Sequence, residues 1–309
     1  MALQAEIKRE DILKSRDAAQ LFVTDEVATG LTIAPTLNKI VQTGRRYNFY
    51  TREKTSKQIF QDFFADEPIE TAKGAQLIEV SGSEQIPDSV PLLSKGFRYI
   101  VIKEDYEDSP ESFLMDIEDM CYVIVAAIEN SVKEAVNANA PTPSARADIH
   151  DGPWDDSTMI AEDLRGFRND MRHRGIRGRL DLLFHGADSY DHLGNYIIRT
   201  EGIQNLKEEN DVIDYGSVNN TFAEFGPVAG QTFGWPSAAP PGAIVYRKIP
   251  GAYTPIKSKE GTQPYLPVIN MKIIESDGDG MDPVLDMRFG AHWSVPIMRK
   301  QNIFNKTGI

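Results

Sequence analysis

The longest regular pattern in the chain is an apolar stripe between Pro110 and about Asn137. Its members recur at steps of three and four residues: Phe113, Ile117, Cys121 (with Met120), Ile124, Ile128, Val132 and Ala135. This spacing places one apolar face on an α-helix, which at 1.5 Å per residue is roughly 40 Å long. Ser109 is a favourable N-cap, and Pro110 suits the first helical position. We interpret Met120 and Cys121 as core residues rather than redox groups.

The chain before this helix has weaker patterns. Residues 5–21 have apolar positions roughly on one side, which predicts a weakly amphipathic helix or arm. Residues 22–44 carry no clear period, so we expect an extended segment. Because the arm has little apolar surface of its own, we expect another chain to support it and the segment 22–44, which would then be an exchanged segment.

Between Arg45 and Asp105 the pattern changes to strands. Tyr47, Phe49 and Thr51 alternate with polar residues, and GAQLIEV and FRYIVIKED follow. Few bulky apolar residues lie between about 51 and 96, which is typical of a long two-stranded ribbon. A ribbon of this kind is only marginally stable alone and usually lies on a neighbour.

After the long helix the elements are shorter. From Asp156 a second helix carries Ile160, Leu164, Phe167 and Met171 on one stripe, and Gly175 lies near its end. GRLDLLFHG then predicts a buried strand and ADSYDHLGNY a short helix, together a compact α/β subdomain. Residues 268–298 have β-rich arms around DGDG, which predicts a long hairpin.

Composition excludes several classes of protein. The chain has 309 residues with ordinary apolar and charged fractions, so it is globular, but its net charge is −13. That charge repels nucleic acid and anionic lipid, which disfavours a sequence-reading nucleic-acid binder. The single Cys121 excludes an internal disulfide framework or thiolate zinc site. The charged start lacks a signal peptide's apolar stretch, and the longest apolar run, nine residues, is too short for a bilayer.

Three acidic clusters are candidate metal sites. Two combine histidine with aspartate: His150, Asp151, Asp155 and Asp156; and His185, Asp188, Asp191 and His192. Neither has the spacing of a known mechanism, so we favour surface or helix-capping roles. The third, Asp277, Asp279 and Asp282, resembles the start of a calcium loop, but Arg288 occupies the position of the closing acid, which favours a hairpin turn. Copies of this turn meeting at a symmetry axis would nevertheless need a cation or screening salt.

A basic cluster stands out in this acidic chain. Six arginines lie within fifteen residues: Arg165, Arg168, Arg172, Arg174, Arg177 and Arg179. No aromatic interleaving or nucleic-acid motif accompanies them. We therefore favour contacts with an acidic face of another subunit over nucleic acid.

The order of these elements resembles the major capsid protein of tailed bacterial or archaeal viruses, with the Hong Kong 97-like fold. QIPDSVPLLSKGFRYIVIKEDYEDSPESFLMDIEDM is similar to a ribbon strand that leads into the spine helix. TMIAEDLRGFRNDMRHRGIRGRLDLLFHGADSYDHL is similar to the opening of the axial domain, and GPVAGQTFGW, GAIVYRKIPGAYTPIKS and RFGAHWSVPIMRKQNIFNKTGI to the closing strands. The similarity covers nearly the whole chain in order.

This resemblance implies an α+β fold with four parts. Residues 1–44 would form the N-terminal arm and 45–104 the extended loop. Residues 105–143 and 262–298 would form the peripheral domain with the spine helix (110–137), and 144–261 with 299–309 the axial domain. The arm and ribbon would then lie across adjacent subunits. Only about 20 residues of helix precede the arm, so we expect no scaffold pro-segment.

The function implied is a structural one. Hexamers and pentamers of the chain would build an icosahedral shell around double-stranded DNA in a virion assembled in the host cytoplasm, with no catalytic residue, cofactor or membrane contact. Portal, decoration or turret proteins are candidate partners. Some family members crosslink a loop Lys to an Asn; Lys54, Lys57, Lys73, Lys95 and Asn270 are possible participants, but we assign no crosslink.

Two other functions stay open, and so does the salt requirement. An encapsulin shares the fold and encloses a cargo enzyme, and a metal-dependent hydrolase using a His/Asp cluster is a remote possibility. The acidic excess also predicts that assembly depends on salt screening, which is compatible with a halophilic origin.

Overall fold

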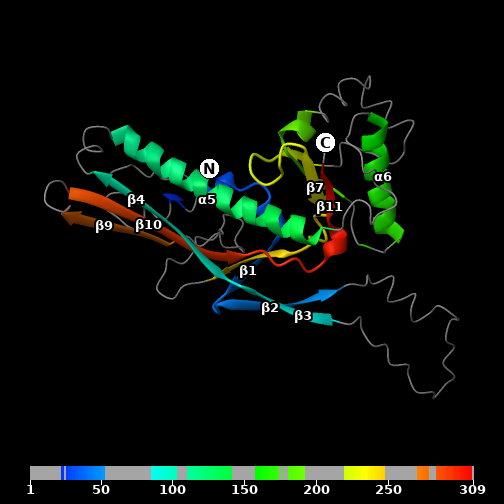
Figure 1. Cartoon of the computed structure of the whole chain (residues 1–309), viewed down its shortest axis with the longest axis horizontal. Helices are drawn as coiled ribbons and strands as arrows, with labels where there is room; N and C mark the ends of the chain where they lie inside the picture. The colour runs from blue at the N-terminus through cyan, green and yellow to red at the C-terminus, as the bar shows by residue number, and fades with distance from the viewer. Residues whose placement is uncertain are drawn as a thin grey trace, which may run out of the picture. The chain divides into compact units, whose positions relative to one another are not determined.

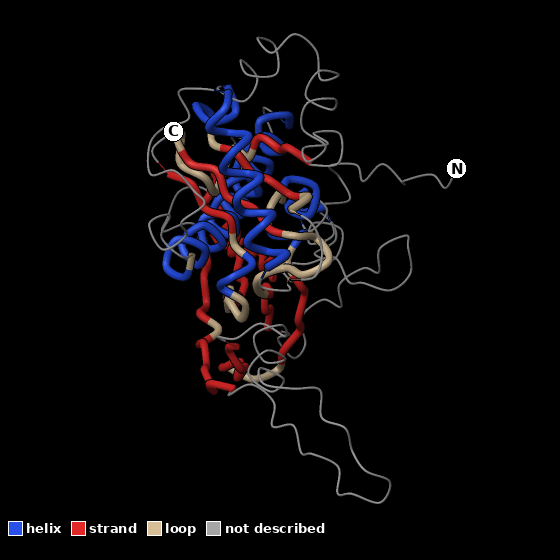
Figure 2. Tube along the Cα trace, turned by 90° about the vertical axis from the view of Figure 1, so that its right-hand side faces the viewer, coloured by secondary structure: helices blue, strands red, loops and turns tan. Residues whose placement is uncertain are grey.

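The computed structural model describes residues 22–23, 26–52, 85–102, 110–140, 157–173, 176, 180–191, 219–247, 270–277 and 283–307. These residues include long helices and mostly antiparallel strands, the α+β class expected from the sequence (Figure 1 and Figure 2). The chain divides into two compact units. The first comprises Met1–Tyr47, Ser89–Ser131 and Ile244–Pro296, and the second Asn48–Asp88, Val132–Ala243 and Ile297–Ile309. The four-part domain division expected above stays a prediction.

The first unit is built on a five-stranded sheet. Its order is β1 (Asn38–Gln42), β8 (Ala243–Arg247), β10 (Pro283–Ser294) and β4 (Leu93–Ile102), and β9 (Asn270–Asp277) also pairs with β10. The β9–β10 pair is antiparallel, with Pro283 opposite Asp277, which confirms the predicted hairpin. Strand β4 runs antiparallel to β10 over ten residue pairs, and Phe97 lies opposite Phe289.

Helix α5 (Pro110–Asn139) runs along this sheet (Figure 1). The helix begins at the predicted residue and ends two residues beyond the predicted 137, so the apolar period located it well. Its buried face carries Ile117, Cys121, Ile124, Val125, Ile128, Glu129, Val132 and Val136. Each fully buried aliphatic side chain of this kind contributes about 1.5–3 kcal/mol. Burial, and then the charges of Glu26 and Glu118, raise the pKa of the Cys121 thiol to about 12, which fits the predicted core role.

The segment before β1 corrects one expectation. Residues 26–30 are helical, and Ala34–Thr36 form a 3-10 turn, η1, so the segment is not extended. Its apolar side chains are buried within the first unit: Val23, Val27, Leu31, Ile33, Ala34 and Leu37. The expectation that another chain supports this part was therefore wrong. The period was invisible because short helical turns and irregular backbone alternate. Residues 1–21 lie outside the described part.

The second unit combines helix α6 with a four-stranded sheet. Helix α6 (Ser157–His173) buries Leu164, Phe167 and Met171, the stripe expected from the sequence. The sheet order is β11 (Phe304–Thr307), β7 (Gln231–Trp235), β5 (Leu182–His185) and β6 (Asn219–Phe222). Strands β5 and β6 are parallel, and the other two pairs are antiparallel. A second short turn, η4 (Lys300–Asn302), precedes β11.

Aromatic side chains fill the core of this unit. The Phe184 and Trp235 rings lie 5.2 Å apart, and Phe167 of α6 meets Phe304 of β11 edge-on at the same centroid distance. Such pairs contribute about 0.5–1.5 kcal/mol beyond their buried area. The C-terminal strand is therefore fixed to α6 as well as to its sheet.

Strands β2 (Arg46–Arg52) and β3 (Gln85–Pro91) form a separate two-stranded sheet. They are the described ends of the ribbon predicted between residues 51 and 96. The predicted strand GAQLIEV and the rest of the ribbon lie outside the described residues.

Candidate functional site

The ribbon presents apolar side chains to solvent. Tyr50 on β2 is 59% exposed and Ile86 on β3 is 41% exposed. Arg46 donates a hydrogen bond to Ser89 at 2.8 Å, and Leu92 N–H donates to Arg45 C=O at 2.9 Å. These bonds hold the two strands together. Phe49 on one face of β2 is buried, whereas Tyr50 on the other face lies open to solvent.

The face of β4 that points away from α5 also exposes apolar residues. Residues alternate along β4, so Phe97 and Tyr99 are half-buried while Arg98, Ile100 and Ile102 are exposed. On β10 the residues facing α5, including Met287, Phe289, Ala291 and Trp293, are buried. We call the opposite side, with Arg98, Ile100, Ile102, Asp286 and Arg288, the outer face of the sheet.

One carboxylate on this outer face is held by two arginines. Asp286 accepts two hydrogen bonds from Arg98, at 3.0 and 3.1 Å, and two from Arg288, at 3.0 and 2.7 Å. These bonds hold the pKa of Asp286 well below its usual range. The Asp286 side chain is nearly buried, whereas both guanidinium side chains are more than half exposed. The cluster therefore presents positive charge to solvent in an acidic chain.

The other end of this face is also basic. Partial burial, followed by the charges of Arg247 and Arg45, lowers the pKa of His292, so this imidazole is neutral at pH 7. The outer face thus combines exposed isoleucines with guanidinium groups, a composition suited to an acidic, partly apolar partner surface.

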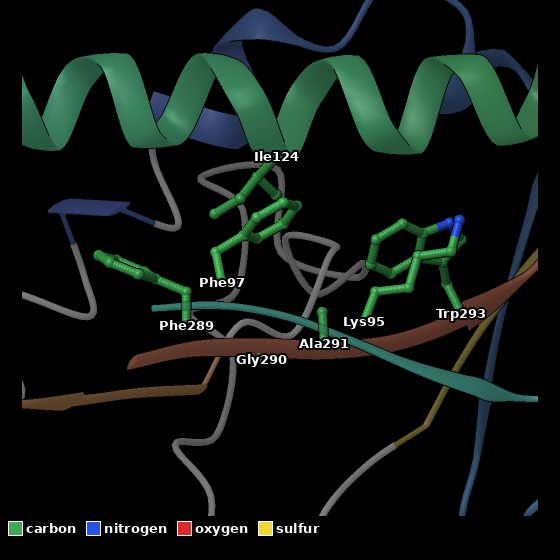
Figure 3. A pocket seen from close by; sticks show the side chains of 7 residues that line it. All are labelled: Lys95, Phe97, Ile124, Phe289, Gly290, Ala291 and Trp293. Atoms are coloured by element: carbon green, nitrogen blue, oxygen red, sulfur yellow. The ribbon is translucent and has the colours of Figure 1, made fainter. Parts of the chain in front are cut away.

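Lys95 is the one crosslinking candidate whose side chain the structure describes. Its ammonium lies 4.6 Å from the centre of the Trp293 ring (Figure 3). The same ammonium donates a hydrogen bond to Ser131 at 2.7 Å. Trp293 Nε1 donates to the same Ser131 oxygen at 3.1 Å. The lysine is thus engaged within its own unit, which disfavours it as a crosslink donor. Lys54, Lys57, Lys73 and the side chain of Asn270 lie outside the described residues.

A small cavity lies between this lysine and helix α5. Phe97, Ile124, Phe289 and Ala291 line most of it (Figure 3), and its volume is about 10 Å³. This is barely the space of one water molecule, and the lining is almost wholly apolar. The cavity is a packing defect rather than a ligand site.

The structure separates one of the two His/Asp clusters. His185 ends a buried strand, is fully buried itself, and pairs through Nδ1 with the Thr232 hydroxyl at 2.9 Å. Asp188 and Asp191 lie on an exposed turn of helix. The expected surface or capping role of His185 was therefore wrong, because β5 carries its ring into the core. His192 and the cluster at His150, Asp151, Asp155 and Asp156 lie outside the described residues. Among the described residues, no three His, Cys, Asp or Glu side chains come close enough to hold a metal.

The arginine cluster is not one exposed patch. Arg168 is buried and donates to the Leu180 carbonyl at 3.4 Å, whereas Arg165 is half-buried and Arg172 exposed. For Arg168, the expected contact with another subunit is replaced by packing within its own unit. Arg174, Arg177 and Arg179 lie outside the described part, as do Asp279, Asp282 and the side chain of Asp277.

Two buried polar contacts fix the C-terminal strand. Lys306 on β11 and Asp163 on α6 form an ion pair at 3.2 Å, with 1% and 0% of their side chains exposed. Gln231 on β7 donates to Asn137 at 2.6 Å and to Asn305 at 2.8 Å. The pattern along the chain did not point to these contacts, because lysine and aspartate are rarely buried unless paired.

Glu129 is a second residue that the apolar pattern missed. It lies on the buried face of α5, is 1% exposed, and accepts hydrogen bonds from the backbone before β1. The sequence gives one signal for this residue: it is an acid on the apolar face of a helix, four residues after Val125 and one after Ile128.

No family model and no curated protein matches the sequence. Solved structures do match, over most of the chain. A virus-like particle from Pyrococcus furiosus is similar at 10% identity and a TM-score of 0.53, over 93% of this chain and 97% of that one. The mature capsid of bacteriophage PhiM1 is similar at 9% identity and a TM-score of 0.51, over 87% of this chain and 85% of that one.

This chain has the Hong Kong 97-like capsid fold. A phage-related protein from Bordetella bronchiseptica is also similar, at 10% identity and a TM-score of 0.53, over 93% of this chain and 95% of that one. The assignment of α5 as the spine helix and of β2–β3 as parts of the extended loop stays a prediction. The resemblance identified from the order of sequence elements is thereby confirmed at the level of fold. None of the described helices is both long and apolar enough to span a membrane.

Proposed function

We propose that the chain is a major capsid protein that assembles into hexamers and pentamers of an icosahedral shell. The observation that carries this proposal is the similarity of fold to a mature phage capsid, over 87% of this chain, and to a virus-like particle, over 93% of it. Assembly, rather than catalysis, is the function that this fold supports best.

Two described surfaces support the proposal. The ribbon exposes Tyr50 and Ile86, and the outer face of the sheet exposes Ile100 and Ile102. Apolar side chains in clusters on a surface commonly mark contacts between proteins. The guanidinium groups of Arg98 and Arg288 add charge complementarity, because a second copy of this chain carries a net charge of −13.

Assembly is tested by producing the full-length protein and examining it by size-exclusion chromatography and electron microscopy. We expect closed particles of uniform diameter. A protein that stays monomeric at high concentration over a range of salt would overturn the proposal.

We propose further that the shell encloses double-stranded DNA in a virion assembled in the host cytoplasm. The acidic balance of the chain disfavours adhesion of DNA to the wall but not its enclosure. Portal, decoration or turret proteins would be further partners. We also propose that residues 105–143 and 262–298 form a peripheral domain and that residues 144–261 and 299–309 form an axial domain.

An encapsulin is the alternative, because one similar structure is described as a virus-like particle. The contents of particles from the native source discriminate the two. Nuclease-protected DNA of uniform length supports a virion, whereas a protein cargo without DNA supports an encapsulin. A hydrolase now has less support, since His185 is buried against Thr232.

The acidic excess leads us to propose that assembly requires screening salt. At about 1 M ionic strength the Debye length falls to about 3 Å, which removes most repulsion between subunits. Particles that stay intact on dialysis into low salt without divalent ions would contradict this part of the proposal.

A further inference from the structure

Glu129 connects two parts of the first unit that are far apart in the sequence. One carboxylate oxygen of Glu129 accepts the N–H of Thr32 at 2.7 Å and the N–H of Ile33 at 2.9 Å. The N–H of Ala34 lies 3.3 Å from each of the two oxygens. A single side chain on α5 thus receives three consecutive backbone donors at the start of η1.

These donors would otherwise lack partners within their own turn. The first N–H groups of any helical turn have no acceptor inside it, and a buried unpaired N–H costs about 1–3 kcal/mol. The N-cap residue Ile33 has no side chain that could accept them. The carboxyl group therefore acts as a cap that a different helix supplies.

The surroundings of this contact are apolar. Ile33 and Ala34 are buried, and Val125 of α5 packs so closely on Gly30 that a Cβ there would lie 2.9 Å from it. Water reaches Glu129 only if residues 31–37 move away from the helix.

Few charged groups face the carboxyl group. Residues 32–37 contain no ionisable side chain. From β8 the buried Tyr246 phenol faces it, and the charge of Glu129 contributes, after burial, to the raised pKa of that phenol. On α5 itself, Lys133 lies one turn further on, and Lys95 of β4 is engaged by Ser131 and Trp293. Among the described residues no cation forms an ion pair with Glu129.

We propose that Glu129 is a pH-sensitive anchor, which holds residues 32–34 on α5 while it is protonated and loosens them when it ionises. The neutral acid still offers a carbonyl oxygen to the N–H groups and loses little by burial. The ionised form makes stronger hydrogen bonds, but it loses its hydration as long as it stays buried. Moving residues 32–34 away restores its hydration.

The direction of the pH effect follows from linkage. Burial raises the pKa of Glu129 from 4.5 to about 7, and this outweighs the three N–H donors, which lower it. The anchored state therefore binds the proton more tightly than an opened state in which the carboxyl group is hydrated. Anchoring is fully favoured below pH 4.5 and is weakened as the pH rises to about 7, by at most about tenfold per pH unit and about 300-fold in total.

This property belongs to a single chain and goes beyond shell formation. It would make the attachment of residues 32–34 to α5 sensitive to pH near neutrality. If this pH dependence is absent, particle formation by the same chain can still be tested separately by electron microscopy.

The test is hydrogen exchange of the full-length protein at pH 5 and pH 8, corrected for intrinsic exchange rates. In the wild type, we expect the opening equilibrium of a peptide covering residues 31–37 to rise at least tenfold between these values. Glu129→Gln, which cannot ionise, should remove this dependence. Glu134→Gln changes an exposed acid on the same helix and should preserve it.

Three results would overturn the proposal. One is equal opening of the wild type at pH 5 and pH 8, which needs no variant and so stands even if Glu129→Gln fails to fold. Another is opening that increases toward acid, which would mean that the N–H donors dominate over burial. The third is an unchanged pH dependence in Glu129→Gln.

Discussion

The buried ion pair between Lys306 and Asp163 gives the sharpest prediction about stability. Lys306→Met keeps most of the side-chain length but removes the ammonium group that pairs with Asp163 in a fully buried site. Removing one partner of such a pair typically costs about 3–5 kcal/mol.

Urea unfolding followed by circular dichroism at pH 7 measures this loss of stability. Lys300→Met removes an exposed lysine from the preceding turn and serves as the control, with an expected change within about 0.5 kcal/mol.

A double variant separates the charge from the packing. Lys306→Met combined with Asp163→Leu leaves no unpaired charge, so it should recover most of the lost stability. The reasoning fails if Lys306→Met costs less than about 1 kcal/mol at pH 7.

Three further predictions concern packing, assembly and acid resistance. A Cβ at Gly234 would lie 2.1 Å from a carbonyl oxygen of β5, whereas one at Gly290 would meet no atom within 4 Å. Thermal unfolding should therefore show Gly234→Ala destabilised by about 3 kcal/mol or more and Gly290→Ala changed by less than about 1 kcal/mol. On the ribbon, Tyr50→Ser with Ile86→Thr should leave the circular dichroism of the unassembled chain unchanged and reduce particle yield in light scattering; undiminished yield would remove the ribbon from the assembly surface. The stabilisation from Asp286, whose pKa is lowered, is present above its unfolded value of 3.8 and is lost only as the pH falls through its lower folded value. Asp286→Asn should therefore destabilise the chain equally at pH 5 and pH 8, and a penalty present only at pH 8 would contradict this assignment.

Local periodicity located the elements that bury a regular apolar face. Helix α5 was predicted to start at Pro110, where it does start, because its buried side chains recur at a helical spacing over many turns. The hairpin of β9 and β10 was equally visible, because two β-rich stretches flank turn residues. These patterns depend only on neighbours in the sequence.

Residues whose environment comes from distant segments were misread or missed. His185 and Arg168 are polar residues that strands and helices carry into the second unit's core. The segment before β1 was expected to depend on another chain, because its partners on α5 lie about a hundred positions later. Glu129 gave no distinctive signal, since an acid on an apolar stripe has meaning only once the groups facing it are known.

The sequence by itself determined the α+β class, the order of the elements, the acidic balance and the resemblance to the Hong Kong 97-like fold. Each of these follows from the local spacing of residues, from composition or from the order of elements along the chain. Only the tertiary structure decided that Glu129 caps a distant turn, that Lys306 is paired with Asp163, and that Asp286 lies between two arginines. These contacts join side chains to groups that folding brings within about 3 Å, and buried charges and hydrogen bonds gain their energy only at such distances.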